Sequence, residues 1–177
     1  MTIQNQVHLY TSYFTIYGEV TPGPAGMYSH MNLPTSSHLE LSNADIIPLF
    51  KLSSEPVHRD RLWLVKEKVV VVVLERVSEM GTSNLSRRGF TRPFPHWVRA
   101  EVGDYELTGV LQLGGNFEFG EVISKGERNF IPLYKARLGS ALYPAVNVEM
   151  PVMLFNRKWL QGMALLTPRE IPEGETV

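Results

Sequence analysis

Five consecutive valines at positions 69–73 constrain the fold of this 177-residue chain more than any other feature. Valine loses side-chain freedom in a helix and packs well on a pleated surface, so the run predicts a β-strand. Because no polar residue interrupts the run, both faces of that strand are expected to be buried. Charged residues flank it at positions 66–68 and 75–76, as gatekeepers do beside aggregation-prone strands. We therefore expect a central strand between two layers, or a strand buried at an interface.

Further strands are predicted where aromatic and β-branched residues gather between turn signals. Residues 7–20 are predicted to form one strand that ends at the Thr-Pro-Gly-Pro stop of residues 21–24. Residues 98–102 alternate apolar and polar side chains, and a Gly-Asp turn separates them from residues 105–111, which predicts a β-hairpin. Residues 146–150 alternate in the same way and lead into a further apolar stretch.

Helical periodicity is weak along the chain. Residues 39–50 could hold one or two helical turns that begin near Ser42, and Pro48 limits their length. The sequence therefore predicts a mostly β protein with little helix.

Three short sequence matches recur in the same order in the two halves of the chain. Residues 13–20 match 104–111, residues 45–51 match 129–135, and residues 63–69 match 153–159, with offsets of 91, 84 and 90. The changes in offset require loop-length differences of about six residues, which surface loops tolerate. The matches predict an internal duplication, in which the valine run belongs to the last strand of the first unit and residues 159–166 form its counterpart.

If the halves share one fold, three pairs of residues occupy equivalent positions: Gly18 with Gly109, Pro48 with Pro132, and Lys68 with Lys158. The predicted fold is two tandem small β-barrel or β-sandwich units. They span residues 1–80 and 93–166, with a linker at 81–92 that is rich in small polar residues and a polar tail at 167–177.

This pattern resembles an uncharacterised bacterial family of small β-domains. In that family a glycine-containing strand leads through a variable loop to a Phe-Ile-Pro-Leu-type segment, and then to a hairpin with an Asn-Lys or Asn-Arg turn. The second half matches better, with Asn156 and Arg157 at the turn, because Glu67 replaces the asparagine in the first half. A weaker likeness connects the chain to Sm-like small barrels, which are strongly bent and oligomeric. The RNA-binding loops of that family are missing here, so the likeness implies no RNA binding.

Composition narrows the functional classes. The chain has no cysteine, which excludes disulfides, thiol catalysis and cysteine-ligated zinc, and which fits a reducing cytoplasm. A net charge of −1 gives no overall attraction to nucleic acid or anionic membranes. The N-terminal residues lack a signal-peptide pattern, and no apolar run approaches the roughly twenty residues of a membrane helix. We expect a cytoplasmic protein without a membrane span.

No catalytic, metal-binding or cofactor-binding residue is predicted, and no cofactor is expected. The five histidines, His8, His30, His38, His58 and His96, lack metal-ligand spacing and are interpreted as surface loop residues, with a metal site or a histidine base as the alternative. Acidic residues at Glu118, Glu121 and Glu127 surround a Gly-Gly pair, a pattern that an exposed loop explains as well as acid–base chemistry does.

The densest unusual segment is residues 86–99, where arginines alternate with aromatic residues. This composition is typical of protein-interface hot spots and of platforms that stack single-stranded nucleic acid, although a solvated linker also explains it. The candidate partner-binding residues are Arg87, Arg88, Phe90, Arg92, Phe94, His96 and Trp97. The sequence favours a non-enzymatic interaction or assembly protein that self-associates or binds a protein partner. A small-molecule or single-stranded nucleic-acid binding module is the alternative, with nucleic acid disfavoured by the neutral net charge.

Overall fold

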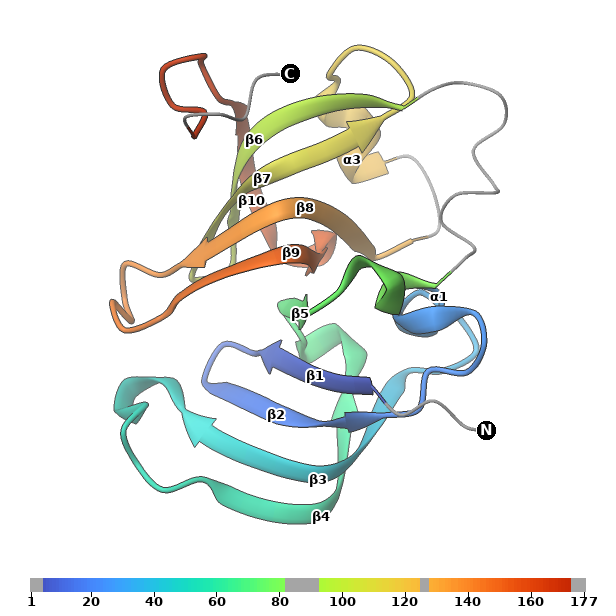
Figure 1. The fold of residues 1–177 in the computed structure, drawn as a ribbon, viewed down its shortest axis with the longest axis vertical. Helices are drawn as coiled ribbons and strands as arrows, with labels where there is room; N and C mark the ends of the chain where they lie inside the picture. The colour runs from blue at the N-terminus through green and yellow to red at the C-terminus, as the bar shows by residue number, and fades with distance from the viewer. Residues whose placement is uncertain (1–4, 82–92, 125–127, 173–177) are drawn as a thin grey trace.

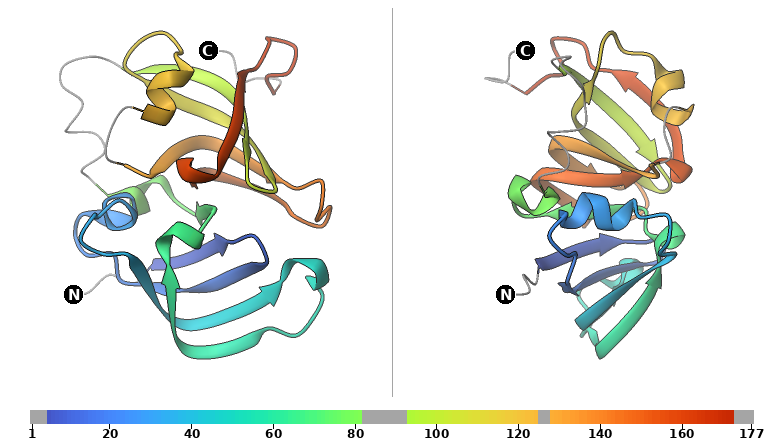
Figure 2. Two further views of the ribbon diagram at one scale, coloured as in Figure 1. Left: turned by 180° about the vertical axis from the view of Figure 1, so that it is seen from behind. Right: turned by 90° about the vertical axis from the view of Figure 1, so that its right-hand side faces the viewer.

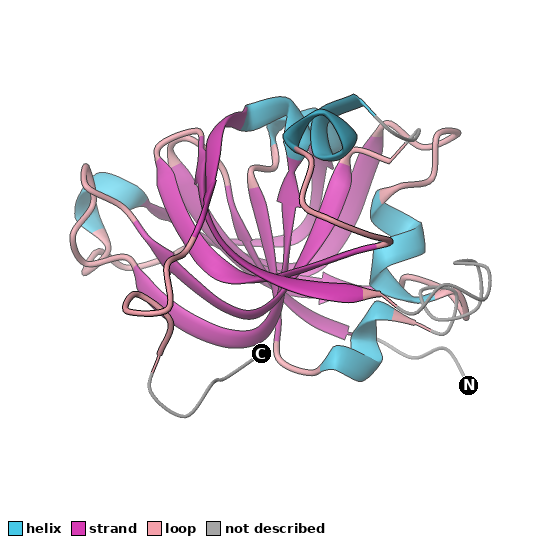
Figure 3. Cartoon of the chain, turned by 90° about the horizontal axis from the view of Figure 1, so that it is seen from above, coloured by secondary structure: helices cyan, strands magenta, loops and turns pink. Residues whose placement is uncertain are grey.

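The fold is a ten-stranded antiparallel sheet, bent so that the first five strands form one lobe and the last five form the other (Figure 1). The structure, a computed structural model, describes residues 5–81, 93–124 and 128–172. The sheet makes up the body of the molecule, and the short helices lie at its margins (Figure 3). The mostly β prediction is thus confirmed. None of the helices in the described ranges is long and apolar enough to cross a membrane.

The strands divide evenly between the two halves. The first half contains β1 (Asn5–Tyr10), β2 (Phe14–Val20), β3 (His38–Pro48), β4 (Val57–Val65) and β5 (Val71–Leu74). The second half contains β6 (Phe94–Val102), β7 (Tyr105–Leu113), β8 (Phe130–Gly139), β9 (Asn147–Asn156) and β10 (Leu160–Leu165). The helical segments are α1 (Gly26–Met31), α3 (Phe119–Ser124) and the 3₁₀ turns η1 (Leu49–Lys51), η2 (Lys66–Lys68), η3 (Val77–Met80) and η4 (Arg157–Trp159).

The order of strands across the sheet is the same in both halves. The complete order is β10-β6-β7-β8-β9-β5-β1-β2-β3-β4, so in each half the last strand pairs with the first. The halves meet where β9 pairs with β5. Strands β4 and β10 remain at the two ends of the order, and the sheet does not close on itself.

The valine run forms the strand at the centre of this order, as predicted. Strand β5 pairs with β1 on one side and with β9 on the other, and each of its residues is buried. Val71 and Val73 pack into the core of the second half, whereas Val72 and Leu74 pack into the core of the first half. Successive side chains of a strand point to opposite faces, so this one strand contributes to both cores.

A bulge lies at the same place in both halves. The β2–β3 register shifts at Gly18, and the β7–β8 register shifts at Gly109. Opposite these glycines the chain carries two residues with positive φ, Asn43 at 49° and Lys135 at 48°. Each glycine permits a close approach to the neighbouring strand, because a Cβ on Gly109 would lie 2.7 Å from the carbonyl oxygen of Tyr134.

The register tests the three predicted pairs of equivalent residues. Gly18 and Gly109 occupy equivalent places, since each lies on the second strand of its half opposite a valine of the first strand, Val7 and Val98 respectively. Pro48 and Pro132 do not occupy equivalent places. Pro48 lies opposite Phe14 at the end of β3, whereas Pro132 lies near the start of β8. That prediction is wrong because the bulge, and not the local Ile-Pro-Leu similarity, sets the register.

The third pair differs by one position. Lys68 is the last residue of its 3₁₀ turn, and Lys158 is the middle residue of the corresponding turn. Glu67 is therefore the residue that occupies the place of Lys158.

Two predicted elements are wrong and one is confirmed. Residues 7–20 form a hairpin instead of one strand, because the Thr11 hydroxyl accepts hydrogen bonds from the amides of Tyr13 and Phe14 and closes a turn. Of residues 39–50, residues 39–48 form most of β3 instead of a helix, since β2 and β4 pair with this segment on both sides, and only residues 49–50 are helical, at the start of η1. The hairpin predicted around residues 103–104 is present as β6 and β7.

Candidate interaction site

The predicted partner-binding segment lies only partly within the described residues. Arg87, Arg88, Phe90 and Arg92 lie outside them. Of the remaining three residues, all in β6, Phe94 is 55% exposed and Trp97 is 7% exposed. His96 Nε2 lies 2.8 Å from the carbonyl oxygen of Gly115, and its ring packs edge-on against Phe117. Phe94 is thus the one of these three whose side chain is exposed to solvent.

The histidines do not lie in loops, so that interpretation is wrong. His30 is in α1, and the other four are in strands, where backbone pairing with neighbouring strands holds them. His58 Nδ1 lies 2.8 Å from Asp45 Oδ1 on the neighbouring strand, and this contact raises the pKa of His58. Within the described ranges, no three His, Asp or Glu side chains gather closely enough to hold a metal ion. Glu118 directly precedes the short helix α3, and Glu121 lies within it. Glu127 lies outside the described residues.

A histidine–hydroxyl pair occurs on the first hairpin. His8 Nε2 lies 2.5 Å from Thr15 Oγ1, and the His8 ring stacks on Tyr17 at 3.9 Å between centroids. Burial lowers the pKa of His8 to about 4, so its imidazole is neutral at pH 7. A neutral imidazole beside a hydroxyl can act as a base in catalysis, but Thr15 is buried and its oxygen is closed to a substrate.

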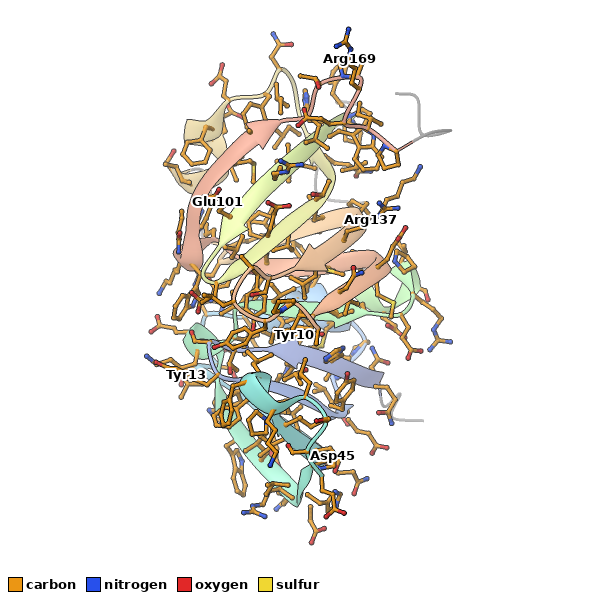
Figure 4. All side chains as sticks on the ribbon, turned by 90° about the vertical axis from the view of Figure 1, so that its left-hand side faces the viewer. Tyr10, Tyr13, Asp45, Glu101, Arg137 and Arg169 are labelled. Carbon is orange, nitrogen blue, oxygen red and sulfur yellow. The ribbon has the colours of Figure 1, made fainter. Side chains whose placement is uncertain are left out.

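The same aromatic cluster connects the two halves. Tyr10 packs edge-on against Tyr105, whose hydroxyl donates a hydrogen bond to the carbonyl oxygen of Thr11. Burial, together with the nearby Tyr17 side chain, raises the pKa of Tyr10. Figure 4 shows Tyr10 at the level where the two lobes meet, and Asp45 lower down, on the first lobe. These contacts indicate a packing role for the cluster, in which Tyr10, Tyr105 and Thr15 are buried and Tyr17 is partly exposed.

The sheet edges carry the exposed apolar side chains that a binding function needs. Strand β4 lies along the bottom of Figure 1, and β10 is the red strand that crosses the upper lobe in the left view of Figure 2. Each has one hydrogen-bonded neighbour among the described strands. On β4, Trp63 is 57% exposed and Val65 is 49% exposed, and on β10 Leu165 is 50% exposed. A strand with an unpaired edge presents free amide and carbonyl groups to another chain.

Charged residues occupy the other half of β4. Arg61 Nη2 lies 3.1 Å from Glu40 Oε1, and the guanidinium lies 5.9 Å from the centroid of the Trp63 ring. Charged side chains on an edge strand limit its pairing with unrelated chains, so the apolar end at residues 62–65 is the part suited to contact. Sequence reasoning missed this edge, although the change from charged residues at 58–61 to apolar residues at 62–65 was a usable signal.

The junction between β9 and β5 shows how a covered edge is built in this protein. Val71 to Leu74 lie opposite Phe155 to Val152 in antiparallel register. The Asn156 side-chain amide donates to the Val69 carbonyl oxygen at 2.9 Å, and the Trp159 indole N–H donates to the Glu67 carbonyl oxygen at 2.8 Å. Lys158 and Glu67 form an ion pair at the same end of the junction.

No known family model matches the chain, and no curated protein or solved structure is significantly similar to it. The geometry of the sheet and its edges is therefore the basis for a functional proposal.

Proposed function

We propose that this protein is a non-enzymatic assembly protein, composed of two copies of one small β-unit, that binds protein chains through the edges of its sheet. The observation that carries the proposal is the contrast between the edges and the centre. The edge strands β4 and β10 present exposed apolar side chains, whereas β5 and the residues of β9 that pair with it, 152–155, are all buried. Edge-strand addition uses these backbone groups and alternate side chains for recognition.

Three structural correspondences support the duplication within this proposal. Both halves pair their last strand with their first. Both carry a glycine bulge on their second strand, opposite a residue with positive φ, at Asn43 and at Lys135. Non-glycine residues rarely adopt positive φ, so the recurrence of this feature at matching places favours a common origin of the two units.

Mass in solution tests the proposal. Light scattering over a range of protein concentrations is expected to give masses above the 20.1 kDa of one chain. Trp63→Lys should reduce the mass toward that of one chain, because it places a charge in the proposed contact. Phe50→Lys is the matched control, since Phe50 is an exposed aromatic residue in η1, outside both edge strands. A chain that stays at the monomer mass, or one that responds to Phe50→Lys alone, would contradict the proposal.

A second measurement separates the assembly function from nucleic-acid binding. The arginine–aromatic segment predicts that substitution of Arg88, Arg92 and Phe94 by alanine would remove any binding of a fluorescent single-stranded oligonucleotide at moderate salt. Trp97 is left intact because it is buried. A monomer that binds the oligonucleotide, and loses that binding in the triple variant, would replace the assembly function with nucleic-acid binding.

A further inference from the structure

The two open edges correspond to the two strands that already pair inside the molecule. Strand β4 leads into η2, as β9 leads into η4, and each is the fourth strand of its half. Strand β10 pairs with β6, as β5 pairs with β1, and each is the last strand of its half. The two strands with free edges are therefore β4, which corresponds to β9, and β10, which corresponds to β5.

Equivalent residues of the two halves are separated by 91 positions, so the register of the internal junction can be transferred to the free edges. Val7 lies opposite Gly18 and Val98 lies opposite Gly109, a separation of 91 in both strands (98 − 7 and 109 − 18). Leu9 lies opposite Val72 and Ala100 lies opposite Met163, which again gives 91 (100 − 9 and 163 − 72).

The same separation relates the strands of the junction. Leu64 and Phe155 occupy corresponding places in β4 and β9, and 155 − 64 is also 91.

We propose that a second copy of this chain pairs its β10 with β4 of the first copy, in the register of the β9–β5 junction. This inference rests on the proposed function, for which it names the partner and the contact. In that register Met163 lies opposite Trp63, as Val72 lies opposite Leu154 within the chain. The exposed Trp63 ring would then enter the core of the second half of the next copy, as Leu154 enters the core of the first half.

Charge at the turns is compatible with this pairing. Glu67 of one copy and Lys158 of the next would take the places that Lys158 and Glu67 occupy in the internal ion pair, with the two signs exchanged. Two internal hydrogen bonds are not reproduced, because Val65 and Lys68 stand in the positions of Asn156 and Trp159 and lack the side-chain amide and the indole N–H that donate there. The contact between copies should therefore be weaker than the internal junction and depend on protein concentration.

The proposed contact joins two different surfaces, so each bound copy leaves one β4 and one β10 free. Repetition of such a contact gives a closed ring when the rotation between copies closes, and an open filament when it does not. The expected product is thus an assembly that can exceed a dimer, which distinguishes it from a symmetric dimer made through β4 alone.

Cysteine cross-linking tests the register directly, because the natural chain has no cysteine. Asn156 donates its amide hydrogen to the Val70 carbonyl oxygen, which makes the neighbouring pair Val73 and Met153 a non-hydrogen-bonded pair of the ladder. Side chains of such pairs lie close together and suit a disulfide. The corresponding residues at the edges are Ala164 and Leu62.

The variant with Leu62→Cys and Ala164→Cys should form disulfide-linked multimers under mild oxidation, read on a non-reducing gel. The control variant, with Leu62→Cys and Met163→Cys, is displaced by one residue and should lose this cross-linking, because the two thiols point to opposite faces. Leu64→Cys with Gly162→Cys tests the same register at a second place, in case the first variant does not fold. Circular dichroism verifies the fold of each variant.

The outcomes separate this inference from the proposed function. Cross-linked multimers in the two matched double variants, with none in the displaced control, would support it. Dimers formed by Leu62→Cys alone would overturn it in favour of β4 paired with β4. Masses above that of one chain, with no cross-link in either matched variant, would overturn this register and leave the proposed function standing. A strict monomer would overturn both.

Discussion

The two halves of the molecule place their strands in the same order, yet their last strands differ in the number of neighbouring strands and in composition. Strand β5 lies between β1 and β9, and its four residues are all valine or leucine and all buried. Strand β10 pairs with β6 alone and contains Gln161, Gly162 and Ala164 at places where β5 and the residue before it have valine. The place of a strand in the complete sheet, at its centre or at its edge, thus determines its composition more than its place in the repeated unit does.

The first strands differ in a similar way. His8 in β1 stacks on Tyr17 and contacts the buried Thr15. Arg99, at the corresponding place in β6, is exposed, and its Nε lies 3.6 Å from Glu106 Oε1. Tyr10, two residues after His8, reaches Tyr105 in the second half, so the first hairpin takes part in the contact between lobes. A position that faces the junction holds an aromatic cluster, and its counterpart away from the junction holds a solvated ion pair.

The largest expected effect comes from a charge placed in the central strand. Val71→Asp should reduce the free energy of unfolding by on the order of 4 kcal/mol, because it buries an unpaired carboxylate at a fully buried position. Ala164→Asp, on the exposed face of β10, should change it by less than about 1 kcal/mol. Urea unfolding at a concentration where the protein is monomeric measures both variants. Equal effects would mean that β5 and β10 do not differ as described.

The next effect compares the two bulge glycines. Gly109→Ala should cost about 2 kcal/mol, because its Cβ would lie 2.7 Å from the backbone oxygen of Tyr134, which cannot move independently. Gly18→Ala should cost about half as much by the same reasoning, since its nearest neighbour is the Leu41 methyl group at 3.0 Å, at the end of a flexible side chain. Gly139→Ala is the control, with no atom within 4 Å of its Cβ. Thermal unfolding ranks the three variants, and a smaller cost at Gly109 than at Gly18 would refute this account of the bulges.

The smallest effect concerns pH and the first hairpin. The pKa of His8 is lowered by burial from 6.5 to about 4, so the unfolded chain binds a proton more readily than the folded chain does. Stability is therefore complete above pH 6.5 and is lost as the pH falls toward 4, with a decrease of roughly 1–2 kcal/mol between pH 7.5 and pH 5. His8→Gln should remove that part of the decrease, measured by urea unfolding at the two pH values.

His58→Gln provides the control of opposite sign. Its contact with Asp45 raises the pKa of His58, so the contribution of this histidine is present below pH 6.5 and is lost as the pH rises through the folded value. If the decrease in unfolding free energy between pH 7.5 and pH 5 disappeared in the His58 variant and persisted in the His8 variant, that decrease could not be assigned to the buried His8.

The sequence alone predicted the features that depend on neighbouring residues. The valines of β5 identified a strand with two buried faces, and the Gly-Asp turn identified the β6–β7 hairpin, because side-chain shape and turn chemistry act over a few residues. The matched glycines at positions 18 and 109 were found for the same reason. Thr11 was a local signal as well, but a run rich in β-branched residues on both sides of it concealed the turn.

Only the tertiary structure decided which strands are neighbours and which edges stay open. The pairing of β9 with β5 joins residues about eighty positions apart, and no local pattern specifies it, since many strands could satisfy the same backbone groups. Residues 39–48 became a strand because β2 and β4 hydrogen-bond to them on both sides, which overrides their local preference. The exposure of Trp63, the burial of Trp97, and with them the candidate interaction site, follow from the strand order, which long-range packing determines.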